Sequence, residues 1–116
     1  MEITVNSYFS GAGLMDLGLQ QAGLHIGQAF ELDSDACKTY RYNFGSHMKQ
    51  SDLSQELVLE QDSCDVMVFT YPCNKYSAIA DLFGNRTGDE LFLHALRHLA
   101  VARPEMYVVE NVVGMK

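Results

Sequence analysis

The sequence predicts an α/β domain with a mostly parallel sheet, and three observations lead to that prediction. Apolar runs of strand length alternate along the chain with segments of helical period. The 116 residues are 47% hydrophobic and 20% charged, which is typical of one packed domain. No internal repeat, low-complexity tract or long linker divides the chain. We expect about five strands with flanking helices, an incomplete version of a doubly wound sheet.

The first half of the chain supplies three predicted strands and two helices. The strands are expected over 3–9, 26–32 and 48–50, and a helical turn over 55–60. The first helix spans about 14–22 and stops at Gly23, with an inner face formed by Leu14, Leu17, Gly18 and Ala22. Asp33 or Ser34 caps the second helix, which runs through Tyr42 and buries Ala36, Cys37, Tyr40 and Phe44.

The second half supplies two more strands and one helix. Residues 65–69 form the most apolar strand, as expected for a strand covered on both faces, and a long loop follows over 70–88. The next helix starts at a capping box of Thr87 and Glu90 and ends before Pro104. Its predicted inner face consists of Leu91, Phe92, Ala95, Leu96 and Leu99. The last strand covers 106–109.

The charge and the cysteines limit the classes of function. Eight basic and 15 acidic side chains give a net charge of −7, the wrong sign for a chain that grips nucleic-acid backbones by itself. No apolar run approaches the length of a membrane span, and the N-terminus lacks a signal-peptide pattern, so an intracellular protein is the simplest expectation. Three scattered cysteines do not form a disulfide framework.

A glycine turn follows the first predicted strand. Gly11 and Gly13 allow a ligand to approach the backbone closely, and Glu31 follows Gly11 at about the 20-residue spacing of a ribose-binding acid. A tight turn with an ordinary acid at a strand end is the competing interpretation. Because no G-x-G-x-x-G pattern is present, S-adenosylmethionine is favoured over NAD.

Two further reactive groups follow predicted strands. Pro72 restricts the loop that holds Cys73, and Lys75 could favour the Cys73 thiolate. Glu110 ends the apolar last strand, where a carboxyl group can donate or shuttle a proton. Taken singly, a loop thiol without a task and a solvent-facing acid remain the alternatives.

A metal site is not expected. His94 and His98 have the spacing of one helix face, but the residues between them lack the glutamate of a zinc-protease helix. We expect both histidines on a solvated or partner-facing side of their helix.

In this order, these segments resemble the cytosine-5 DNA methyltransferase family over nearly the whole chain. Residues 8–14 look like its F-x-G-x-G-G motif, with Leu14 in place of the last glycine, and 51–53 look like its G-D-I segment. Residues 65–74 resemble the strand and P-C-Q motif, with Thr70-Tyr71 and Asn74 as departures. Residues 86–92 resemble R-x-x-L-F, and 110–112 form E-N-V.

The resemblance implies a Rossmann-like, S-adenosylmethionine-dependent methyltransferase sheet and a set of site residues. Cys73 would be the nucleophile and Glu110 the acid that holds the pyrimidine. The implied residues that bind S-adenosylmethionine, or its product S-adenosylhomocysteine, are Phe9, Ser10, Gly11, Gly13, Leu14, Glu31, Leu32, Asp52, Leu53, Pro72 and Leu91. The loop 78–88 would be a lid over the base.

The resemblance also suggests what the chain is part of. The arginine-containing Q-x-R-x-R motif and the target-recognition region of the family are absent, so residues 1–116 are expected to form a partial catalytic domain, inactive alone. Double-stranded DNA would be gripped mainly by other segments or by a complementing C-terminal polypeptide. The implied setting is cytoplasmic, at a bacterial or phage nucleoid, in restriction-modification. Methylation of cytosine in transfer RNA, or a non-catalytic subunit of a split enzyme that binds S-adenosylmethionine, are the alternatives.

Overall fold

The computed structural model describes residues 2–53, 64–70 and 88–110, and of 88–92 it describes only the backbone. The elements follow in the order β1 (Thr4–Tyr8), α1 (Leu14–Gln21), β2 (His25–Glu31), α2 (Ser34–Phe44), β3 (Met48–Gln50), β4 (Val66–Phe69), α4 (Gly88–Ala102) and β5 (Met106–Val109). The strands predicted over 48–50 and 106–109 begin and end at the predicted residues. The turn predicted over 55–60, the loop predicted over 70–88 apart from its two end residues, and its lid segment 78–87 lie outside this description.

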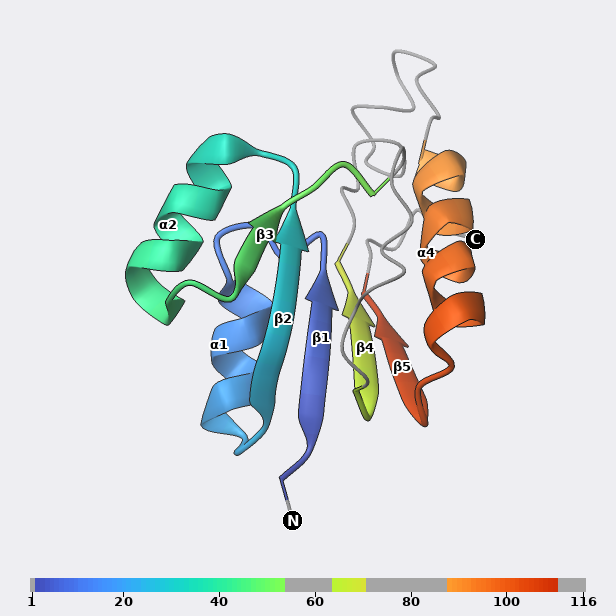
Figure 1. The fold of residues 1–116 in the computed structure, drawn as a ribbon, viewed down its shortest axis with the longest axis horizontal. Helices are drawn as coiled ribbons and strands as arrows, with labels where there is room; N and C mark the ends of the chain where they lie inside the picture. Colours follow the sequence, from blue (N-terminus) through green and yellow to red (C-terminus); the bar gives the residue numbers. More distant parts are fainter. Residues whose placement is uncertain (1, 54–63, 71–87, 111–116) are drawn as a thin grey trace.

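The five strands form one parallel sheet in the order β3-β2-β1-β4-β5 (Figure 1). Every pairing in the described sheet is parallel, from β2 with β3 through to β4 with β5. Chain crossovers between parallel strands place all the carboxyl ends at one edge. This confirms the predicted fold class and brings the segments after each strand together.

Helices cover both faces of the sheet, which gives three layers (Figure 1). On one face Val5, Ile26 and Val68 pack against Met15 and Leu19 of α1. On the same face α2 contributes the second cluster, in which Tyr40 and Cys37 pack with Ala29 and Met48. On the opposite face α4 packs Ala95 and Leu99 against the largest cluster, formed by Tyr8, Phe30, Leu53, Met67 and Phe69.

Tyr8 lies at the centre of the core on the α4 face. Its ring stacks on Phe30 at 5.0 Å and on Phe69 at 4.9 Å between ring centroids. The ring of His98 on α4 lies 5.6 Å from Tyr8, and His98 is 1% exposed. The expectation that His98 lies on a solvated or partner-facing side is therefore wrong. Its Nδ1 lies 2.8 Å from the carbonyl oxygen of His94, one turn earlier on the same helix.

The predicted inner face of α1 is also wrong. Leu14 is 86% exposed and Leu17 is 42% exposed, whereas Asp16 between them is fully buried. Met15 and Leu19 face the core instead. The helix is thus rotated relative to the prediction because Asp16, unexpectedly, has buried partners.

The other two helices agree better with the predictions. Cys37 and Tyr40 of α2 are buried as predicted, and the side chain of Asp33 caps the helix by accepting from the amide of Ala36 at 2.8 Å. On α4 the inward direction of Ala95 and Leu99 is confirmed, but Leu96 is 42% exposed. The side chains of Leu91 and Phe92 lie outside the described residues. In the parts of the chain that the structure describes, no helix is long and apolar enough to cross a membrane.

Candidate functional site

The turn after β1 has an unusual backbone at three of its five residues. Phe9 has φ 57°, Gly11 has φ 59° and Gly13 has φ 101°. A non-glycine residue in this left-handed region is uncommon and concentrates at functional sites. Two main-chain hydrogen bonds hold the turn: Ser10 N donates to Phe30 O at 3.0 Å, and Gly13 N donates to Ser10 O at 3.1 Å.

Glu31 at the end of β2 accepts hydrogen bonds from the main chain of this turn and from the main chain just before α2. Its Oε1 accepts from the amide of Gly11 at 2.9 Å, and its Oε2 accepts from the amide of Asp33 at 2.8 Å. Each carboxylate oxygen has a second lone pair, so the group can still accept hydrogen bonds from a ligand. Glu31 is half-buried.

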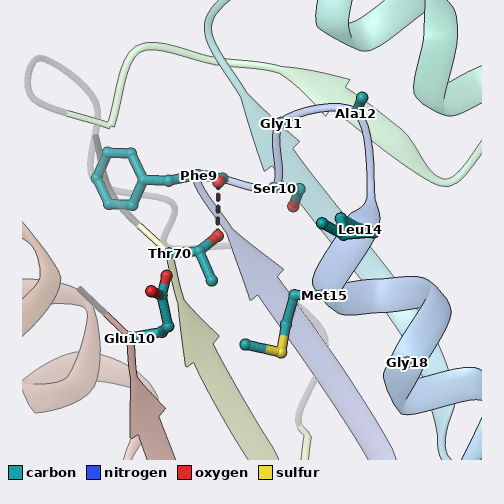
Figure 2. A pocket seen from close by; sticks show the side chains of 9 residues that line it. All are labelled: Phe9, Ser10, Gly11, Ala12, Leu14, Met15, Gly18, Thr70 and Glu110. Atoms are coloured by element: carbon teal, nitrogen blue, oxygen red, sulfur yellow. Dashed lines mark hydrogen bonds between the residues drawn. The ribbon is translucent and has the colours of Figure 1, made fainter. Parts of the chain in front are cut away.

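The ends of β4 and β5 lie beside the glycine turn. The Thr70 hydroxyl donates to the carbonyl oxygen of Phe9 at 2.8 Å, which ties the end of β4 to the turn. The Glu110 amide donates to Phe69 O at 3.0 Å, so Glu110 lies next to Thr70 across the sheet. Figure 2 shows the exposed Glu110 carboxyl group beside Thr70, below the turn.

These ends enclose one side of a pocket of about 580 Å³. It is lined by Phe9, Ser10, Gly11, Ala12, Leu14, Met15, Gly18, Thr70 and Glu110 (Figure 2). A Cβ built on Gly11 would meet no atom within 4 Å, so the main chain of the turn is open to an incoming group. The pocket thus combines apolar side chains, an accessible turn and one carboxyl group, the usual make-up of a small-molecule site.

The structure brings together five of the predicted site residues and separates others. Phe9, Ser10, Gly11, Leu14 and Glu110 line the pocket. Gly13 lines a neighbouring groove between α1 and α2, and Leu32 is exposed beyond β2. Asp52 and Leu53 follow β3, where Leu53 is 3% exposed within the core cluster of the α4 face. Pro72 and Cys73 lie outside the described residues, as does the side chain of Leu91.

Sequence reasoning missed several residues at this site. It placed neither Met15, Gly18 nor Thr70, which line the pocket, in the site, and it gave no role to Asp16 directly behind it. The one available signal was a carboxylate placed between Met15 and Leu17 in an apolar helix, where an exposed stripe is the ordinary explanation. In the part of the chain that the structure describes, no group of three His, Cys, Asp or Glu side chains could hold a metal ion.

Comparisons with known proteins agree with this arrangement. A sequence profile of the family described as C-5 cytosine-specific DNA methylase matches residues 3–116. The chain is 34% identical over 110 residues to the Type II methyltransferase M.FnuDI of Fusobacterium nucleatum, covering 94% of this chain and 32% of that protein. It is 35% identical over 115 residues to the Type II methyltransferase M.Eco47II of Escherichia coli, covering 97% and 28%.

A solved structure shows the same fold. The chain matches a prophage-encoded Escherichia coli protein described as a DNA modification methyltransferase with a TM-score of 0.81 and 27% identity, covering 99% of this chain and 34% of that one. The chain therefore spans about a third of the length of the relatives it matches. Since the profile matches from residue 3 to residue 116, the chain belongs to the C-5 cytosine-specific DNA methylase family.

Proposed function

We propose that this chain forms the cofactor-binding and catalytic part of a DNA cytosine-5 methyltransferase. The observation that carries the proposal is the pocket in which the glycine turn after β1 meets Glu110 at the end of β5. A family profile that matches the whole sheet, and relatives named Type II methyltransferases, support it. Those names also favour a role in restriction-modification.

S-adenosylmethionine fits the chemistry of the turn and would supply an electrophilic methyl group when bound. The open main chain at Gly11, the apolar side chains of Leu14 and Met15, and the free lone pairs of Glu31 suit a ligand with ribose hydroxyls and an apolar face. Asp52, Leu53, Leu32, Pro72 and Leu91 are further proposed contacts from the sequence resemblance. Glu31 would orient the ribose while holding the turn.

Cys73 is the proposed nucleophile, three residues beyond Thr70. Its thiolate would form a bond to carbon 6 of a cytosine rotated out of the duplex, which makes carbon 5 nucleophilic. Glu110 would bind the ring nitrogen edge and place a proton there, which offsets the charge created by the attack. After carbon 5 gains the methyl group and loses its proton, the carbon–sulfur bond breaks and the thiolate leaves.

Double-stranded DNA is the proposed substrate, and this chain would make few of the contacts that bind it. Its net charge of −7 opposes contact with phosphates, so Lys and Arg side chains of other segments or of a complementing polypeptide would hold the duplex. Cys73 and Glu110 would then act on the extruded base, and the glycine turn would hold the cofactor.

Covalent trapping tests the nucleophile. Full-length gene product incubated with S-adenosylmethionine and duplex DNA containing 5-fluorocytosine should form an adduct that survives denaturing electrophoresis. Cys73→Ala should abolish the adduct, and Cys64→Ala, which changes a half-buried thiol whose pKa is raised by burial, should keep it. An adduct that persists in Cys73→Ala, or the absence of any adduct between the wild type and this DNA, would overturn the proposal.

A further inference from the structure

A buried chain of polar side chains lies directly behind the proposed cofactor turn. Asp16 of α1 is fully buried, and so is Tyr40 of α2. The Ser7 hydroxyl of β1 donates to Asp16 Oδ1 at 2.7 Å, and the Tyr40 hydroxyl donates to Asp16 Oδ2. A buried carboxyl group is costly unless it is hydrogen-bonded, and here both oxygens have a donor.

One end of this chain reaches the pocket. Ser10, which lines the pocket, has its hydroxyl oxygen 2.7 Å from that of Ser7 and 3.1 Å from the carbonyl oxygen of Ser7. Because the Ser7 hydrogen already goes to Asp16, Ser10 is the donor, and its single hydrogen lies between the hydroxyl and carbonyl oxygens of Ser7. Both acceptors of the Ser10 hydrogen thus belong to Ser7, and the Ser7 hydroxyl is oriented by Asp16.

The other end reaches His47, which is half-buried before β3. Its Nε2 lies 3.1 Å from the Tyr40 hydroxyl oxygen. Since the single Tyr40 hydrogen goes to Asp16, His47 donates to Tyr40. All donors therefore point toward the Asp16 carboxylate, from Ser10 through Ser7 on one side and from His47 through Tyr40 on the other.

Tyr40 also contacts the turn directly. A Cβ built on Gly13 would lie 2.9 Å from Tyr40 Cδ2 and 2.3 Å from Phe44 Cε2, so the main chain of Gly13 rests on these two rings. Gly13 N donates to Ser10 O, which closes the turn. The network therefore holds the turn at both Ser10 and Gly13.

We propose that Asp16 is a positioning residue that holds the turn 10–13 in its ligand-binding shape through Ser7 and Tyr40. This inference rests on the proposed cofactor function of the pocket. Burial raises the pKa of Asp16, while the hydrogen bonds from Tyr40 and Ser7 act in the opposite direction and favour the carboxylate. A hydrophobic residue at position 16 would fill the same space without fixing the direction of the Ser10 hydroxyl.

Two measurements on the wild-type chain and on Tyr40→Phe test the proposal. Phe keeps the ring beneath Gly13 and removes one donor to Asp16. We expect S-adenosylhomocysteine to bind about fivefold to tenfold more weakly, as for the loss of one ordinary hydrogen bond, under conditions where both proteins are folded. We also expect amide hydrogen exchange at Gly11 and Gly13 to accelerate by about tenfold in the ligand-free chain.

Ile26→Val is the matched control, because Ile26 is buried near the start of β2, at the far end of the sheet from the turn. It should destabilise the chain to a similar degree and change neither local exchange at Gly13 nor affinity. If Tyr40→Phe does not fold, Ser7→Ala removes the other donor with a smaller change in volume and serves in its place.

The outcomes separate this inference from the proposed function. The role of Asp16 is overturned if exchange at Gly11 and Gly13 accelerates no more than the global loss of stability explains. It is also overturned if exchange at these two amides accelerates but the affinity for S-adenosylhomocysteine stays the same. If the wild-type chain binds no S-adenosylhomocysteine, the proposed cofactor function fails. The exchange rates alone then decide whether Asp16 positions the turn.

Discussion

Gly11 and Gly13 both adopt positive φ angles, but their surroundings differ. A Cβ at Gly11 meets open space, so Gly11→Ala carries only the backbone cost of the left-handed region, about 1 kcal/mol. A Cβ at Gly13 would collide with Tyr40 and Phe44 in addition, and overpacking brings the total to about 3 kcal/mol. Urea unfolding of the two variants should show this difference. Equal losses would mean that Phe44 can move away freely.

The buried histidine His98 predicts a pH-dependent stability. Burial lowers the pKa of His98 from its ordinary value of 6.5, so the folded chain binds fewer protons than the unfolded chain between the two values. Stability should therefore fall as the pH falls through that window, by at most about 1.4 kcal/mol per pH unit for this one proton. Burial lowers the pKa of His47 as well, with the same sign.

Unfolding curves at several pH values between 7 and 5 check this prediction. His98→Gln, which can keep a donor near the carbonyl oxygen of His94, should show a shallower decline than the wild type. His25→Gln changes an exposed histidine and should leave the decline in place. Burial raises the pKa of Asp16, so the titration of Asp16 changes stability with pH in the opposite direction to that of His98. All three proteins contain Asp16, so this contribution does not affect the comparison. Parallel curves for His98→Gln and wild type would contradict the prediction.

At the scale of one element, α1 shows why periodicity predicted a helix but placed its inner face wrongly. Leu14, Leu17 and Gly18 form one apolar stripe, and Met15 and Leu19 form another. The second stripe lies next to Asp16, and the prediction placed the first stripe on the core. In the structure Ser7 and Tyr40 satisfy Asp16, and these partners lie on other elements that no local pattern reveals.

The orientation of α1 predicts unequal costs for two identical substitutions. Leu19 packs against the core cluster of Val5, Ile26 and Val68, so Leu19→Ala should lower the free energy of unfolding by about 2 kcal/mol. Leu17 is 42% exposed and lies outside the core clusters, so Leu17→Ala should cost about 0.5 kcal/mol or less. Chemical denaturation of the pair measures both values. A larger loss for Leu17→Ala would mean that the helix is rotated toward the face predicted from the sequence.

At the scale of the whole molecule, the position of β4 could be predicted because a parallel strand buried on both faces gives a continuous apolar run. The convergence of Gly11, Glu31 and Glu110 at one sheet edge followed from the same parallel topology. Contacts between side chains of distant segments could not be predicted. The contact of the buried His98 ring with Tyr8, and the packing of Gly13 on Tyr40 and Phe44, depend on how the helices are rotated on the sheet.

The edge strand β5 leads to a prediction about whether the chain associates in solution. Within the described sheet β5 pairs only with β4, and Met106 and Tyr107 are each 60% exposed on it. An edge strand with unpaired main-chain groups and exposed apolar side chains tends to associate with other chains. We therefore expect sedimentation velocity to show association that grows with protein concentration.

A charge on this edge strand should weaken the association. Tyr107→Lys places a cation on the strand edge, as natural proteins do to prevent edge pairing, and should shift the chain toward the monomer. Tyr42→Lys makes the same chemical change at a 91% exposed position on α2, distant from β5 along the sheet order, and should associate like the wild type. If both variants shift equally, net charge controls the association. If the wild type stays monomeric at every concentration, the prediction is wrong.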